Sequence, residues 1–150
     1  MTMKTRLTLM MMPLLLGIVF FQSCEKDDVK VNRLDLLTDY IWVYDTLEIL
    51  PTSDANFMLA AAFVHMAFQG SEYDFSQDST YVMTSPNTTL SGTWELIDNK
   101  TIWMDKGTEN EMQLEIVSIS ESRSSLRLHL EGEFFETPYA GDVIMKFNTK

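Results

Sequence analysis

Hydrophobic and polar side chains alternate in short runs through most of the second half of the chain. The clearest run covers 111–120, where Met112, Leu114 and Ile116 alternate with polar residues. A period of two predicts a β-strand with one buried face and one wet face. Turn-forming residues separate the runs. We expect eight strands, at 40–50, 72–75, 80–84, 91–97, 100–105, 111–120, 124–135 and around 143–147.

Strands of this kind pair as antiparallel neighbours, because each has one wet face. Eight of them can close into a barrel whose interior holds side chains or one small ligand. The predicted fold is therefore mainly β, an eight-stranded antiparallel barrel. Strict alternation points the following side chains inward: Tyr73, Phe75, Tyr81, Met83, Trp94, Leu96, Ile102, Met104, Met112, Leu114, Ile116, Leu126, Leu128, Leu130, Val143, Met145 and Phe147.

Residues 55–69 break the alternation and predict one helix, inserted between the first and second strands. The alanines at 60–62 favour a helix, Asp54 offers a cap and Gly70 offers a stop. At about 1.5 Å per residue the helix is about 22 Å long, too short to span a bilayer. His65 is the only polar side chain from 57 to 68, so most of the circumference should be covered. The wettest stripe contains Asp54, Met58, Ala61, Ala62, His65 and Gln69.

The beginning of the chain has the order of an export signal. Lys4 and Arg6 precede an apolar run at 7–21, and Ser23 stands before Cys24, the only cysteine. A charged region, an apolar region and a small residue before a cut are the parts of a signal peptide. A cysteine directly after the cut resembles that of bacterial lipoproteins, in which the thiol takes up a diacylglycerol. A transmembrane helix and a plain secretory signal are the alternatives.

Cleavage before Cys24 divides the chain into a signal peptide (1–23), an acylated tether or linker (24–38) and a barrel domain (39–150). The tether begins with Glu25, Lys26, Asp27 and Asp28. This tetrapeptide resembles the acidic export tag of surface-exposed lipoproteins in the Bacteroidota; a plain soluble tether is the alternative. We therefore expect an outer-membrane protein, held by its N-terminal acyl anchor and exposed at the cell surface, with the periplasmic face as the other location.

Net charge narrows the classes of partner. After cleavage, nine basic residues stand against 22 acidic ones, a net charge of −13. Such an acidic surface opposes nucleic acid and anionic lipid headgroups, so we expect no nucleic-acid partner. Since Cys24 is the only cysteine, no disulfide can form within the domain, and a hydrophobic core must hold it together.

Three motifs in the first half of the barrel form a connected series. They are Tyr73-x-Phe75-x-x-Asp78-Ser79-Thr80-Tyr81, then Gly92-Thr93-Trp94-Glu95-Leu96, then Lys100-Thr101-Ile102. The series resembles the lipocalin-like domain of many Bacteroidota lipoproteins, in which a turn glycine stands where this chain has Ser79. The resemblance covers roughly 38–148. Its motifs are structural, so they indicate a fold better than a function.

The resemblance also implies a place for the helix. In lipocalins the connection between the first two strands crosses the barrel mouth, and in the related fatty-acid-binding barrels a helical lid occupies it. By analogy, the helix at 55–69 would cap the mouth. The candidate ligand pocket is then lined by Trp42, Phe57, Phe63, Phe68, Tyr81, Trp94, Met104 and Met145. The alternative is that these side chains fill the barrel and leave no cavity.

Residues with catalytic or metal-binding chemistry do not gather in any recognisable pattern. There is no Gly-x-Ser-x-Gly, phosphate loop or zinc helix motif, and His65 and His129 have no His or Cys at ligand spacing. We expect no enzyme activity, no metal and no cofactor. Trp103 lies on the opposite face from its inward neighbours, where it either packs under a loop or anchors a partner.

Two functions follow from these patterns. The first is a lipid-anchored lipocalin-like barrel that binds a small apolar or amphipathic ligand. The second is an accessory interaction subunit of an outer-membrane complex, with the barrel as scaffold and the helix and Trp103 as contact surface. A barrel with no cavity above about 100 Å³ counts against the first. An apolar helix left exposed favours the second.

Overall fold

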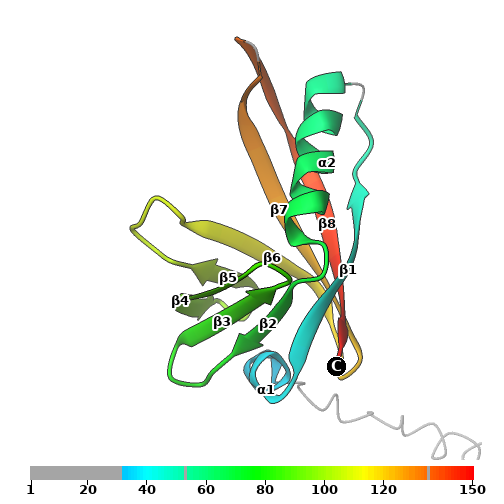
Figure 1. The fold of residues 1–150 in the computed structure, drawn as a ribbon. Coiled ribbons are helices and arrows are strands. Elements are labelled where there is room, and N and C mark those ends of the chain that lie inside the picture. Colours follow the sequence, from blue (N-terminus) through cyan, green and yellow to red (C-terminus); the bar gives the residue numbers. More distant parts are fainter. Residues whose placement is uncertain (1–31, 53, 135) are drawn as a thin grey trace, which may run out of the picture. The chain divides into compact units, whose positions relative to one another are not determined.

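Among the residues that it describes, the computed structural model of this chain has eight antiparallel strands that close into a barrel (Figure 1). The structure describes residues 32–52, 54–134 and 136–150. Each strand pairs with its neighbour in sequence, and the last pairs with the first. The predicted mainly β fold with an eight-stranded barrel is thereby confirmed. The strands are β1 (Ile41–Ile49), β2 (Glu72–Phe75), β3 (Thr80–Ser85), β4 (Thr88–Ile97), β5 (Thr101–Met104), β6 (Met112–Ile119), β7 (Arg123–Phe134) and β8 (Thr137–Thr149).

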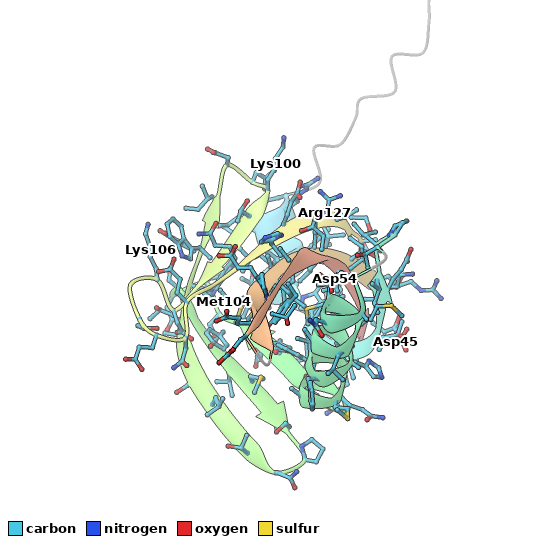
Figure 2. All side chains as sticks on the ribbon, turned by 90° about the horizontal axis from the view of Figure 1, so that it is seen from above. Asp45, Asp54, Lys100, Met104, Lys106 and Arg127 are labelled. Carbon is cyan, nitrogen blue, oxygen red and sulfur yellow. The ribbon has the colours of Figure 1, made fainter. Side chains whose placement is uncertain are left out.

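The alternation of the strands decides which side chains form the core. Every residue that the alternating pattern predicts to face inward lies in the hydrophobic core or packs against it. On β5, Ile102 and Met104 are fully buried, while Trp103 between them faces outward and is only partly buried. Around the barrel, charged side chains such as Lys100, Lys106 and Asp45 point away from the centre (Figure 2).

The two last strands are longer than the others and carry the helix. β7 and β8 have 12 and 13 residues and form a hairpin that extends beyond β2–β6 (Figure 1). The predicted helix is α2 (Ala55–Phe68), between β1 and β2. It lies lengthwise along this extension, and its main contacts are with β8, β1 and β7. These three strands therefore cover only one side of α2.

Local chemistry fixes both ends of α2. The Asp54 carboxylate accepts hydrogen bonds from the backbone N–H groups of Asn56 at 2.9 Å and Phe57 at 3.1 Å, which confirms the predicted cap. At the other end, Gly70 has a φ of 75°, a left-handed conformation that glycine adopts without a steric penalty. Asp54 and Gly70 therefore mark the two ends of a helix of 14 residues.

One face of α2 approaches the sheet closely. The ring of Phe57 occupies the space that a Cβ atom at Gly141 of β8 would need, with three ring atoms 2.7–2.8 Å from that position. Close approach favours small side chains beside Phe57, and Ala60 and Ala61 are buried there. The prediction that Ala61 lies on the wettest stripe is wrong, because this long-range fit to Gly141 turns the helix.

A second helix, α1 (Arg33–Asp39), precedes the barrel. Its residues were expected to belong mostly to the linker at 24–38. Asn32 caps it, accepting a hydrogen bond from the Leu34 N–H at 3.1 Å, and Leu37 is 1% exposed. The Trp42 indole donates to the Leu37 carbonyl at 3.2 Å. Burial of Leu37 thus makes α1 part of the domain, and Asn32–Lys150 forms one compact unit with its own core. Cys24 and the 25–28 tag lie outside the described residues.

Ser79, in the turn between β2 and β3, has a φ of 66°. A residue with a Cβ atom pays roughly 1–2 kcal/mol in this left-handed region. We expect Ser79→Gly to raise the free energy of unfolding of the 32–150 unit by about 1 kcal/mol, as measured by urea unfolding. Ser76 lies in the same turn without a positive φ, so Ser76→Gly should lower stability instead. Equal effects of the two variants would contradict the strain at Ser79.

Candidate functional site

The barrel interior is filled by side chains. The enclosed space at its centre has a volume of about 10 Å³ and is lined mainly by aromatic and aliphatic groups, among them Trp42, Phe68, Tyr73 and Met145. This is roughly the space of one water molecule, whereas pockets for small ligands measure about 300–1,000 Å³. In this conformation the interior has no room for a small apolar ligand.

The predicted pocket residues do not all meet in one place. Six of them are buried in the core: Trp42, Phe57, Tyr81, Trp94, Met104 and Met145. Phe68 is partly buried at the end of α2, where its ring stacks on that of Tyr73 at 6.2 Å. Phe57 lies between α2 and Gly141, on the hairpin extension. Phe63 is 50% exposed, on the outer side of α2.

Hydrogen bonds give several of these residues a structural role. The Trp94 indole donates to the Ser76 carbonyl at 3.0 Å. The Tyr81 hydroxyl donates to the Asp105 carboxylate at 2.6 Å, and the same carboxylate accepts the Thr93 N–H at 3.0 Å. Burial raises the pKa of Tyr81, and its hydrogen bond to Asp105 raises it further. These contacts join β3, β4 and the loop after β5 at one end of the barrel.

Trp103 packs beneath a lysine on the outer surface. The Lys106 Nζ atom lies 4.0 Å from the centre of the indole ring, and Lys106 also pairs with Glu95 on the neighbouring strand. The indole N–H is buried and has no hydrogen-bond partner among the described residues. Because the ring is partly covered by its own chain, Trp103 offers a partner less surface than an exposed tryptophan would.

The outer face of α2 is the most extended apolar surface on any described helix. Met58, Leu59, Phe63 and Met66 are 51%, 43%, 50% and 58% exposed. The prediction that most of the helix is covered is therefore wrong, because β1, β7 and β8 cover one face and the opposite face is equally apolar. Single exposed hydrophobic residues are ordinary, whereas a group of four on one helix is typical of an interaction surface.

Three of these four residues could not be singled out from the sequence. The patterns predict Phe63 in the pocket and Met58 on the wettest stripe, and they indicate no role for Leu59 and Met66. The signal was present in the spacing of Leu59, Phe63 and Met66, which are four and then three residues apart and share one helical face. Nothing in the local pattern distinguished that face from the buried one, because both are apolar.

One edge of α2 is tied to β1 by a polar contact. The Tyr44 hydroxyl and the His65 Nδ1 atom are 2.7 Å apart, and the ring of Tyr44 also packs against Phe68 and Phe147. Burial, followed by the negative charge of Asp45, raises the pKa of Tyr44 to about 12. The neutral phenol is therefore the form that the folded state favours.

This raised pKa predicts a loss of stability in alkali. An unfolded tyrosine ionises near pH 10, so the contribution of Tyr44 is fully present below about pH 10 and is lost as the pH rises towards about 12. Burial shifts the pKa of Tyr73 and of Tyr81 in the same direction. The urea concentration at which half of the 32–150 unit is unfolded should fall between pH 10 and pH 12, and it should fall less steeply in Tyr44→Phe. An identical dependence on pH in that variant would contradict the raised pKa of Tyr44.

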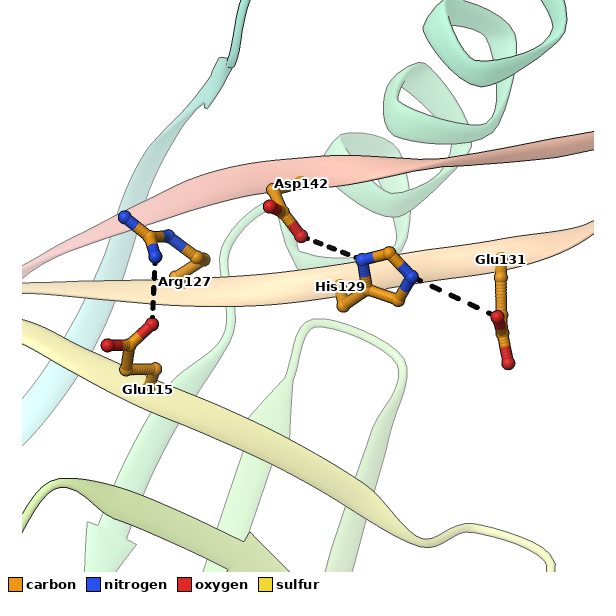
Figure 3. A network of polar contacts seen from close by, with 5 residues as sticks. All are labelled: Glu115, Arg127, His129, Glu131 and Asp142. Atoms are coloured by element: carbon orange, nitrogen blue, oxygen red, sulfur yellow. Dashed lines mark hydrogen bonds and ion pairs between the residues drawn. The ribbon is translucent and has the colours of Figure 1, made fainter.

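A polar network covers the outer surface of β6, β7 and β8 (Figure 3). Arg127 pairs with Glu115 at 2.9 Å, and His129 lies 2.7 Å from Asp142 and 3.9 Å from Glu131. Exposed ion pairs of this kind contribute about 0–1 kcal/mol each. Within the part of the chain that the structure describes, no group of His, Cys, Asp and Glu could hold a metal ion. The network is best explained as a solvated outer face.

None of the described helices has the length and apolar character needed to cross a membrane.

No protein-family model matches the chain, and no curated protein matches it either. The resemblance to lipocalin-like domains therefore remains a prediction from the motifs around Tyr73, Trp94 and Thr101.

Proposed function

We propose that this chain is a non-catalytic, lipid-anchored protein of the outer membrane whose barrel presents α2 as a docking surface for another protein molecule. The observation that carries this proposal is the exposed apolar face of α2, formed by Met58, Leu59, Phe63 and Met66. An apolar helical face in water is unfavourable by about 25 cal/mol for each Å² exposed. A bound partner removes this cost, and the closed barrel holds the face in position.

The proposed location is supported by the N-terminal sequence. The charged and apolar segments before Cys24 and the acidic residues after it resemble those of an exported, acylated chain. The acidic outer faces of the strands suit a solvated position and do not favour contact with anionic headgroups. The acyl chain at Cys24 would thus provide the membrane contact, with the domain outside the bilayer, at the cell surface.

A ligand inside the barrel is the second candidate function. It is favoured by Tyr73, whose side chain lines the central space and whose buried hydroxyl makes no hydrogen bond of 3.5 Å or less among the described residues, although the Ser71 side chain is near enough to offset part of the rise that burial causes in its pKa. A polar group in that position could orient an amphipathic molecule. Such a ligand would have to displace core side chains from a space of about 10 Å³, which makes this candidate the weaker one.

Photo-crosslinking in the native cell envelope tests the proposed docking surface. A photoreactive phenylalanine analogue replaces Leu59 in the full chain, and a matched variant carries it at Val117, which is 47% exposed on the outer face of β6. We expect a protein adduct from position 59 and none from position 117. Adducts from both positions in equal yield, or from neither, would contradict the proposal.

A further inference from the structure

We propose that the molecule that docks on the outer face of α2 is a second copy of this chain, through an antiparallel pairing of the two α2 helices. This inference rests on the proposed function, since it names the partner for the same surface. It starts from a stripe along the same side of α2, in which Ala55 and Ala62 join Leu59 and Met66 of that face. All four side chains are exposed.

The spacing of the stripe is that of a helix-pairing seam. Its members are four, three and four residues apart, which keeps them on one line along a helix. This line runs opposite the face that Phe57, Ala61 and Phe68 turn towards the sheet. A second helix could lie along it without disturbing any buried contact of α2.

Small and large side chains alternate along the stripe in a self-complementary way. An antiparallel pair centred on the middle of the helix places Ala55 opposite Met66 of the second copy, and Leu59 opposite Ala62 of the second copy. Each large side chain then meets a small one, so the two helices can approach closely without voids. A parallel pair would set each residue against itself, large against large and small against small, and would pack poorly. The two-fold symmetry is that of most homodimers.

The absence of charge on this face suits a second copy better than a partner that docks through its basic residues. No Asp, Glu, Lys or Arg occurs from 55 to 69, so the surface offers an oppositely charged partner no ion pair. What complements a neutral apolar helix is another neutral apolar helix. The domain from residue 32 onward carries seven basic and 19 acidic residues, a net charge of −12, so two copies repel at a distance. Salt screens this repulsion, and the pairing should strengthen as ionic strength rises.

The exposed area fits a weak, reversible pair. Met58, Leu59, Phe63 and Met66 are each about half exposed, which leaves on the order of 100 Å² per side chain. Two copies would bury on the order of 800 Å² of apolar surface, below the roughly 1,200–2,000 Å² of stable complexes. Two chains anchored in one membrane would meet at a raised effective concentration, which makes such a pair populated there.

Cysteine crosslinking in the full chain tests the pairing and its direction. In the antiparallel register, residue 62 and its copy are offset by about 4.5 Å along the helices, whereas residue 55 and its copy are offset by about 16 Å. Ala62→Cys and Ala55→Cys are compared in the native envelope, with a rigid thiol crosslinker too short to bridge the larger offset. The unmodified chain, whose only cysteine is Cys24, is the control for crosslinking through the anchor position.

We expect a product of twice the chain mass from Ala62→Cys, little from Ala55→Cys and none from the control. The yield should rise with salt and be lost when Leu59→Asp is added to Ala62→Cys. Equal yields from both cysteines, or no product from either, would overturn the antiparallel pair. The photo-crosslinking at position 59 separates the two proposals. An adduct of another mass there leaves the docking function standing and refutes the second copy, and no adduct refutes both.

Discussion

Phe57→Ala is expected to lower the free energy of unfolding of the 32–150 unit by about 3–5 kcal/mol. The ring is 0% exposed and lies against the backbone of β8 at Gly141, so its removal opens a cavity that neither α2 nor the sheet can fill. Urea unfolding followed by circular dichroism measures the loss.

Phe63→Ala is the matched control for Phe57→Ala, since it removes the same side chain from the same helix. Its ring is half exposed, so we expect a loss below about 1 kcal/mol. Equal losses for the two variants would mean that α2 is turned differently on the sheet. The comparison therefore tests which face of the helix is buried and which is outward.

Gly92→Ala is expected to destabilise the same unit by about 3 kcal/mol. A Cβ atom at Gly92 would collide with the Asp105 carboxylate and would lie 2.7 Å from the Tyr81 ring. Overpacking of this kind costs about 1–3 kcal/mol, and displacement of the Tyr81 hydroxyl from Asp105 adds about 1 kcal/mol. Thermal and urea unfolding measure the total.

Two further variants separate the parts of that effect. Tyr81→Phe removes the hydrogen bond to Asp105 without crowding, and should cost about 1 kcal/mol. Ser91→Ala adds no bulk at the exposed neighbouring position on β4, and should change stability by less than about 0.5 kcal/mol. A Gly92→Ala variant as stable as Ser91→Ala would show that the Tyr81–Gly92–Asp105 contact is not close-packed.

The strands and their buried faces could be predicted because the pattern that decides them is local. In β6, for example, Leu114 and Ile116 alternate with polar neighbours, and a residue in a strand has only two faces to choose from. Every inward assignment along β2 to β8 therefore agrees with the core. Asp54 could be predicted as the cap of α2 for the same reason, since a capping side chain acts on residues two and three positions away.

The orientation of α2 could not be predicted, because its circumference is almost uniformly apolar. What turns the helix is the fit of Phe57 into the space at Gly141, a contact between residues 84 positions apart. The same holds for α1, whose place in the domain depends on Leu37 reaching the barrel core. Short-range patterns contain no information on such contacts.

That side chains fill the barrel interior could not be predicted from the sequence either. Whether an eight-stranded barrel keeps a cavity depends on how the summed volumes of inward side chains compare with the space that strand tilt and register enclose. Large groups such as Trp42, Tyr73 and Phe147 line the interior, and the space left between them is about 10 Å³. The candidate site consequently moves from the barrel interior to the outer face of α2.

Native mass spectrometry of the full chain, crosslinked within its own cell envelope before release in mild detergent, tests the central claim most directly, because crosslinking preserves a weak complex on dilution. The claim is that the outer face of α2, and not the barrel interior, carries the function. It predicts a complex that contains at least one further protein chain, and no small molecule of fixed mass held by each chain. Single chains that each retain one non-covalently bound apolar molecule would contradict it.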